Sequence, residues 1–140
     1  MTIKQISVFL ENHPGKLAEF TKLLSSESID LRAITIAESS DFGIIRIVAG
    51  DVYNATTILK DNDYICSITD VIAVEVKDRA GALADVITIL GENDVNVEYM
   101  YEMNSRETGV AYMVIRVNDN AKARTILEKN GMRIISQDEL

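Results

Sequence analysis

The chain has 140 residues, of which 47% are hydrophobic and 26% charged, a composition typical of a soluble globular protein. Its formal net charge of −8 argues against nucleic acids and anionic membrane surfaces as partners, because both attract basic patches. No apolar run approaches the roughly 18 residues that a membrane span needs, and the N-terminus lacks the apolar core of a signal peptide. We therefore expect a cytoplasmic protein.

The first half of the chain predicts six elements in the order strand, helix, strand, strand, helix, strand. Apolar residues at period two indicate strands, and apolar residues spaced by about 3.6 indicate amphipathic helices. On these patterns we expect strands at 3–10, 29–36, 43–49 and 64–68, and helices at 16–27 and 51–61.

The second half repeats this order. The segment Val8–Ala18 returns as Val74–Ala84, and Thr57–Leu59 returns as Thr125–Leu127 after a two-residue indel. A repeat of this length predicts two small domains, which we place at residues 1–70 and 71–140 and call the first and second copy. The expected elements of the second copy are strands at 72–76, 95–103, 110–117 and 132–135, and helices at 81–92 and 120–129.

This split β-α-β order predicts an α+β fold of two ferredoxin-like sandwiches, each an antiparallel sheet with both helices on one face. The other face of each sheet then needs cover, because residues 110–117 are apolar on both sides of the strand, as are Ile44-Ile45 and Ile47-Val48. We expect the other copy or another subunit to cover these faces.

The sequence offers no pattern typical of a catalytic or metal site. His13 is the one histidine and Cys66 the one cysteine, so neither a Ser-His-Asp triad independent of His13 nor a structural zinc site can be assembled. Cys66 lies in the apolar context Tyr64-Ile65-Cys66, which favours a buried small hydrophobic residue over a nucleophile. We expect no enzymatic activity, no metal and no cofactor.

A repeated turn between the first strand and the first helix is the strongest candidate site. The turns read Asn12-His13-Pro14-Gly15 and Asp78-Arg79-Ala80-Gly81. Backbone N–H groups at a helix start are unpaired and lie at the positive end of the helix dipole, so they suit a carboxylate. The alternative is structural: Asn12 and Asp78 cap the helices, and the glycines permit a tight turn.

A second repeated feature adds an acceptor for an ammonium group. Asp30 and Asn96 occupy matching positions, each between two apolar residues at the start of the second strand. A carboxylate-binding helix start together with such an acceptor describes a site for a free amino acid. The alternative for Asp30 and Asn96 is a solvated strand end.

The order strand, Leu10–Leu17 turn, helix and Ile29-Asp30-Leu31 resembles the ACT domain, the amino-acid-binding regulatory module of many biosynthetic enzymes. The resemblance spans both copies and implies that effectors bind at the seam between paired domains. It places ligand contacts on the two turns and second strands: Asn12, His13, Pro14, Gly15, Lys16, Leu17, Asp30 and Leu31, and in the second copy Asp78, Arg79, Ala80, Gly81, Ala82, Leu83 and Asn96.

The two copies differ at the turn. The second has Ala80 in place of Pro14, and the carboxylate of Asp78 would repel a ligand carboxylate. The first copy is therefore the better candidate for the ligand.

Three functions compete on this reading. The favoured one is a non-catalytic sensor that binds an amino-acid effector at the interface between ACT domains and signals through the packing of a homodimer or of a metabolic-enzyme partner. The second is a subunit that docks a metabolic enzyme through its apolar sheet face without binding a ligand. The third, an acylphosphatase-like hydrolase, needs an arginine after the first strand, and only Arg79 comes close.

Overall fold

The computed structural model describes residues 1–140, which divide into two compact units. The first unit is Lys4–Thr69, and the second combines Met1–Ile3 with Asp70–Leu140. No helix in either unit is long and apolar enough to cross a membrane.

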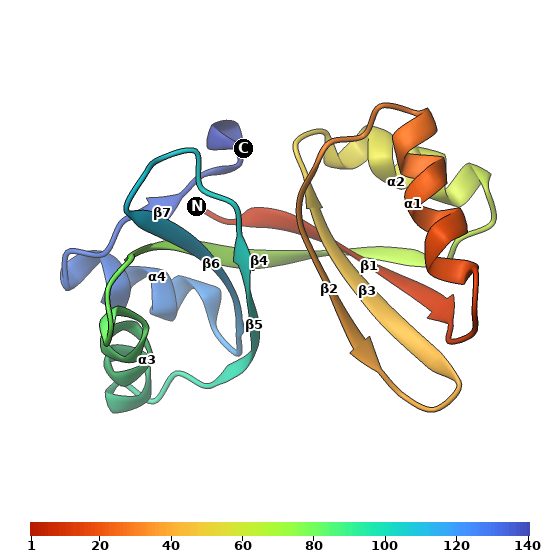
Figure 1. Ribbon diagram of the computed structural model, residues 1–140. Helices are drawn as coiled ribbons and strands as arrows, with labels where there is room; N and C mark the ends of the chain where they lie inside the picture. Colours follow the sequence, from red (N-terminus) through yellow and green to blue (C-terminus); the bar gives the residue numbers. More distant parts are fainter. The chain divides into compact units, whose positions relative to one another are not determined.

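The first unit is an antiparallel sheet with both helices on one face (Figure 1). Strand β3 lies between β2 and β1, and the Phe9 N–H donates to the Ile65 carbonyl 3.0 Å away, just before β4 begins. The elements in chain order are β1 (Ile3–Glu11), α1 (Lys16–Ser26), β2 (Leu31–Glu38), β3 (Phe42–Ala49), α2 (Val52–Asp61) and β4 (Cys66–Lys77).

Strand β4 corrects the sequence prediction of two separate strands at 64–68 and 72–76. It runs without interruption from Cys66 to Lys77, so it begins in the first unit and ends in the second. The physical reason is that the intervening Thr69-Asp70-Val71 contains no glycine or proline, and threonine and valine both favour extended backbone.

The second unit has the same layout, with β6 between β5 and β4 and with β7 on the far side of β4. A short 3-10 helix that the sequence analysis missed follows β7; there Glu139 accepts hydrogen bonds from the Ser136 N–H, at 2.7 Å, and from Arg133. The elements after β4 are α3 (Ala82–Glu92), β5 (Val97–Met103), β6 (Val110–Val117), α4 (Asn120–Lys129), β7 (Ile134–Ile135) and the 3-10 helix Gln137–Glu139.

Both second strands start later than predicted. A register irregularity lies between Leu31 and Ala33 in β2, and another lies between Val97 and Tyr99 in β5. The apolar alternation used to place the strand starts at 29 and 95 is therefore broken at the point where pairing begins.

Each unit has its own core between helices and sheet, and the two cores use matching positions. Ile6, Val8 and Leu24 in the first unit have Ile72, Val74 and Leu90 as counterparts, all fully or almost fully buried. Repeated core positions specify repeated elements, and the predicted pair of ferredoxin-like sandwiches is confirmed.

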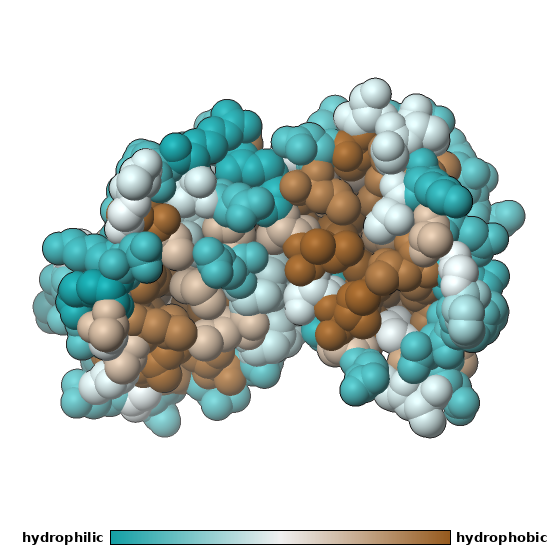
Figure 2. Space-filling view, viewed as in Figure 1, coloured by the Kyte–Doolittle hydropathy of each residue, from teal (hydrophilic) through white to brown (hydrophobic).

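Apolar side chains also remain at the surface of the first unit. Figure 2 shows them gathered over β2 and β3, where Ile34, Ile36 and Phe42 are 43%, 49% and 55% exposed. The expectation that the helix-free faces are covered by another copy or subunit stays a prediction.

Candidate functional site

The starts of α1 and α3 differ from those of α2 and α4. Gly15 and Gly81 occupy the cap positions of α1 and α3 in the left-handed region, with φ of 90° and 86°, and no side chain caps either helix. At α2, by contrast, the Asp51 carboxylate accepts a hydrogen bond from the Asn54 N–H at 3.1 Å, and α4 has an equivalent aspartate cap. The N–H groups that begin α1 and α3 therefore have no side-chain acceptor.

This geometry corrects one alternative and confirms another. Asn12 and Asp78 do not cap the helices, because the cap position falls three residues later, on the glycines. The positive φ of Gly15 and Gly81 is a conformation that other residues rarely adopt, so the glycines do provide the tight turn.

The first turn is tied to the loop between β2 and β3. The Asn12 N–H donates to the Asp41 carbonyl at 3.1 Å, and the Asn12 side-chain amide donates to the Ser39 carbonyl at 3.2 Å. In the second unit, the Asp78 N–H makes the matching backbone bond to the Gly109 carbonyl at 2.9 Å. The two hydrogen bonds of Asn12 link the first turn directly to the β2–β3 loop.

A small hollow of about 100 Å³ lies beside the first turn. Apolar residues of three strands and of α1 form much of it, and the turn itself supplies the polar part. The lining residues are Leu10, Glu11, Asn12, His13, Leu17, Ile36, Gly43 and Ile45.

Charged side chains surround the first turn in two pairs. His13 Nε2 donates to the Glu11 carboxylate at 2.7 Å, and Lys16 Nζ lies 3.5 Å from a Glu19 carboxylate oxygen. The hydrogen bond from His13, helped by the positive charge of Lys16, lowers the pKa of the Glu11 carboxyl. Glu11 is therefore a carboxylate at neutral pH, and its charge is offset locally by Lys16.

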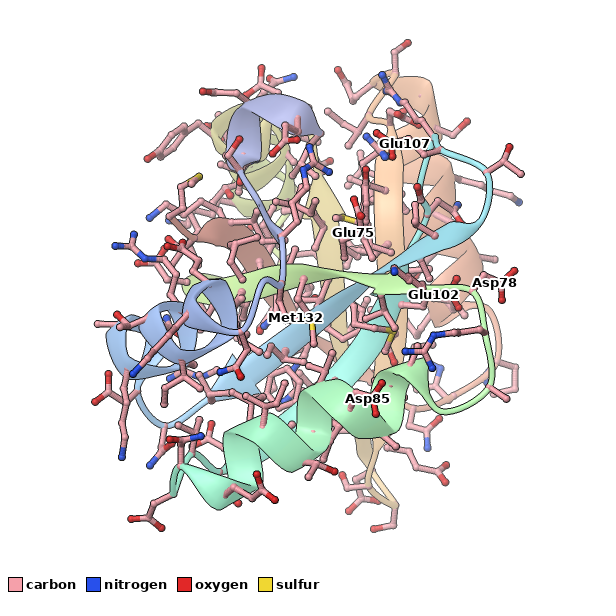
Figure 3. The ribbon with its side chains drawn as sticks, turned by 90° about the vertical axis from the view of Figure 1, so that its left-hand side faces the viewer. Glu75, Asp78, Asp85, Glu102, Glu107 and Met132 are labelled. Carbon is pink, nitrogen blue, oxygen red and sulfur yellow. The ribbon has the colours of Figure 1, made fainter.

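The second turn carries different side chains on the same backbone. Arg79 donates to the Asp85 carboxylate at 2.9 Å, so its guanidinium is held by its own helix. Figure 3 shows Asp78, Asp85 and Glu102 toward the end of the unit at which α3 begins. Because Arg79 offsets the charge of Asp85, the carboxylates of Asp78 and Glu102 remain, and they make this turn a poor place for a carboxylate ligand.

Strand register identifies the counterparts of the hollow in the second unit. Leu10 pairs with Gly43 and its counterpart Val76 pairs with Ala111, so Ala111 replaces Gly43. In the same way, Ile36 pairs with Ile45 and Glu102 pairs with Met113, so Glu102 replaces Ile36. The second unit thus has an extra methyl group and a carboxylate where the first has the hollow.

Asp30 is not brought to the turn of its own unit. It precedes β2 and borders a separate depression with Thr21, Ser25 and Ser28, near the end of α1. The 11 residues of α1 separate that end from the Gly15 turn by about 16 Å, at about 1.5 Å per residue. One small ligand cannot touch both. Asn96 likewise lies just before β5, where its N–H donates to the Asn118 side chain at 3.1 Å.

Three of the predicted contact residues belong to the cores. Ala82 is 5% exposed within the second core, and Leu83 and Leu31 are partly buried against their cores. The sequence analysis missed Gly43 and Ile36. A glycine inside a strand often marks a close approach of a ligand or another backbone, so the position of Gly43 within the predicted strand 43–49 could have indicated a binding residue.

A larger groove of about 530 Å³ lies on the other side of α1, between its first turns and the α2–β4 connection. Lys16, Glu19 and Tyr64 line it together with Phe9 and Phe42. Burial raises the pKa of the Tyr64 hydroxyl, with a contribution from the negative charge of Glu19. The phenol therefore stays protonated at neutral pH.

Comparison with known proteins bears on the whole chain. The family model described as ACT domain pair matches residues 1–140. The crystal structure of protein BT0572 from Bacteroides thetaiotaomicron is 38% identical and has a TM-score of 0.92, with 99% of this chain and 95% of that chain covered. No curated protein matches.

Two regulatory subunits share the fold at low identity. The regulatory subunit of aspartate kinase from Thermus thermophilus, in its ligand-free form, is 13% identical with a TM-score of 0.69, covering 91% of this chain and 90% of that one. The corresponding subunit from Thermus flavus is 16% identical with a TM-score of 0.62, covering 89% and 90%.

Proposed function

Because the chain belongs to the family of ACT domain pairs, we propose that it is a regulatory sensor that binds a free amino acid at the Gly15 turn. An ACT domain pair is a regulatory module, and on this proposal the chain performs no catalysis. The observation that carries the proposal is the helix start of α1, which lacks a side-chain cap and borders the hollow of about 100 Å³.

The two parts of an amino acid match the two parts of this site. A ligand carboxylate is stabilised by the N–H groups that no side chain caps and by the positive end of the α1 dipole, an effect of about 0.3–1 kcal/mol when exposed and up to about 2 kcal/mol when partly buried. The ligand side chain occupies the hollow, where Leu10, Leu17 and Ile36 offer apolar contacts.

The ammonium group needs an acceptor, and the one carboxylate that lines the hollow, Glu11, already accepts a hydrogen bond from His13 at 2.7 Å. Asp30 suits this role chemically but lies at the other end of α1. We propose that the chain forms a homodimer and that Asp30 of a second chain meets the ammonium, as the resemblance to paired ACT domains implied. Sedimentation of wild type with and without ligand tests whether the chain dimerises, and calorimetry of Asp30→Ala tests whether Asp30 contributes to binding. A wild-type monomer, or an unchanged affinity in Asp30→Ala, contradicts this step.

The bond between Asn12 and the β2–β3 loop provides a route for the signal. On this proposal the loop has two positions, and a ligand at the turn binds more tightly to the protein in one of them. Only such a difference in affinity can shift the equilibrium between the two positions. The Thermus aspartate kinase structures are of regulatory subunits, which supports a regulatory role of this chain toward a metabolic enzyme.

The test is a thermal-shift panel of the twenty amino acids followed by calorimetry. A ligand that binds only the native state at 100 times its Kd stabilises it by about 2.7 kcal/mol, so at least one amino acid should raise the melting temperature clearly. A flat panel contradicts the proposal.

A charge variant locates the binding to the turn. Asn12→Asp copies the acidic residue of the second turn and should weaken binding at least about tenfold, because like charges repel in a partly desolvated site. Asn54→Asp makes the same change in the exposed first turn of α2 and should leave binding unchanged. Equal effects of the two variants would place the ligand elsewhere.

Exposed aromatic residues favour the second function, docking of an enzyme without a ligand. Phe9 and Phe42 are 52% and 55% exposed and line one hollow of about 380 Å³ with Ala37 and Ile44. A flat amino-acid panel together with an enzyme complex that is lost in Phe42→Ser would replace the sensor proposal with this one.

A further inference from the structure

We infer that Gly43 and Ile36 are the residues that determine specificity at this site, and that its ligand is an amino acid with a small aliphatic side chain. The inference rests on the proposed function and adds the class of ligand. It is carried by the shape and lining of the hollow beside the first turn and by the residues at the matching places in the second unit.

Gly43 is not required by the backbone of β3. Its φ lies outside the left-handed region, and a Cβ built on it would meet the Ile36 Cγ2 at 3.6 Å and the Leu10 carbonyl oxygen at 3.9 Å, which are ordinary contacts. Alanine therefore fits without strain, and it would also make the strand more stable, because glycine weakens a strand through its conformational freedom. What glycine provides here is space, because a methyl group at this position would fill part of the hollow.

The hollow sets limits on the side chain it accepts. Its volume of about 100 Å³ is below the roughly 150 Å³ of an apolar cavity that holds benzene, so the hollow cannot enclose an aromatic side chain. The polar lining lies at the turn that would hold the ligand carboxylate, whereas the side chains of Leu10, Leu17 and Ile36 offer no hydrogen bonds. A charged side chain directed at these apolar residues would lose hydration without compensation. A small aliphatic side chain satisfies both limits.

The second unit shows the opposite choice at both positions. Ala111 adds the methyl group that Gly43 lacks, and Glu102 places a carboxylate where Ile36 is apolar. The same aliphatic side chain would meet a smaller space and an acidic wall there. These two positions therefore explain why one copy and not the other is suited to this ligand.

Calorimetry on the full chain tests the inference with six L-amino acids: alanine, valine, leucine, phenylalanine, aspartate and lysine. Wild type should bind one of the three aliphatic amino acids most tightly. Gly43→Ala should weaken that ligand at least about fivefold and move the preference to a shorter side chain, since overfilling a packed site costs about 1–3 kcal/mol.

Ile36→Glu copies the second unit and should weaken the same ligand by more than about tenfold, because its carboxylate has to be desolvated. Ile36→Val removes one methyl group and should move the preference to a longer side chain, which keeps the inference testable if Gly43→Ala does not fold. Ala111→Gly in the second unit and Gly91→Ala in α3 are the matched controls and should leave affinity and preference unchanged.

The outcomes separate this inference from the proposed function. If wild type binds an amino acid but Gly43→Ala keeps the same affinity and order of preference, the inference is wrong and the proposed function stands. If wild type binds aspartate, lysine or phenylalanine most tightly, the inference is likewise wrong and the proposed function stands. If wild type binds no amino acid, the proposed function fails and the inference fails with it.

Discussion

The turns before α1 and α3 have one backbone and two chemistries. Both place a left-handed glycine at the helix start, and both leave the helix without a side-chain cap. Each turn is also held by a backbone hydrogen bond to a loop between two strands, β2–β3 in the first unit and β5–β6 in the second. The side chains around them differ in charge and size, with Gly43 and Ile36 in one unit and Ala111 and Glu102 in the other. The turn is therefore common to both units, whereas the side chains of the neighbouring strands differ and determine what the turn can bind.

The cores of the two units differ at Phe20, and this difference gives the largest expected effect. Phe20 is fully buried and contacts Tyr64 edge to face at a ring distance of 5.7 Å, whereas its counterpart in the second unit is Val86. Phe20→Ala should lower the free energy of unfolding by about 3–5 kcal/mol through the cavity it leaves. Val86→Ala removes two methyl groups and should cost about 1.6 kcal/mol at about 0.8 per group. Urea titration of both variants measures the difference, and equal losses would show that the first core collapses around the cavity.

A pair of glycine variants examines what the turn requires. Gly15→Ala forces a left-handed alanine and should cost about 1–2 kcal/mol. Gly91→Ala lies within α3, where nothing is within 4 Å of the new Cβ, and should stabilise the protein by up to about 1 kcal/mol. The melting temperature should therefore fall in Gly15→Ala and rise in Gly91→Ala. A neutral Gly15→Ala would mean that the turn can relax to a right-handed start.

Sequence patterns predicted the elements and the repeat because apolar periodicity and buried position are directly linked. Ile6, Val8 and Leu24 recur as Ile72, Val74 and Leu90 in both the sequence and the cores. The continuous β4 was missed because a change of unit inside an extended strand needs no turn residue.

The candidate site was predicted only in part. The turns were found from their glycines, but the hollow depends on Ile36 and Gly43, which approach Leu17 through strand pairing rather than through sequence spacing. Asp30 was grouped with the turn because both recur, although a whole helix separates them. Recurrence reports a shared fold and carries no information on distance.

Helices α2 and α4 have an aspartate cap, whereas α1 and α3 have no side-chain cap. The Asp119 carboxylate accepts a hydrogen bond from the Lys122 N–H at 3.0 Å at the start of α4, so Asp119→Ala should cost about 1 kcal/mol. Asp78→Ala, beside α3, should cost less, because Asp78 makes no cap bond there. Chemical denaturation with both variants decides the point. A loss at Asp78 as large as at Asp119 would show that Asp78 acts as a cap after all.

The smallest expected effect concerns the charges at the first turn. The hydrogen bond from His13 and then the charge of Lys16 lower the pKa of Glu11, whereas the second unit has Lys77 at this position. Because the pKa is lower in the folded state than the ordinary value of about 4.3, the contact stabilises the fold above that pH. This contribution is lost as the pH falls through the folded-state pKa.

An NMR titration of the Glu11 carboxyl should therefore show a midpoint below the ordinary range. In His13→Ala the midpoint should rise, and in Lys16→Gln it should rise less, because the hydrogen bond is the larger cause. The change in stability should be barely measurable, since an exposed pair contributes little. An unchanged midpoint in His13→Ala would remove the Glu11–His13 contact as a difference between the two turns, leaving the packing of Gly43 and Ile36 to separate them.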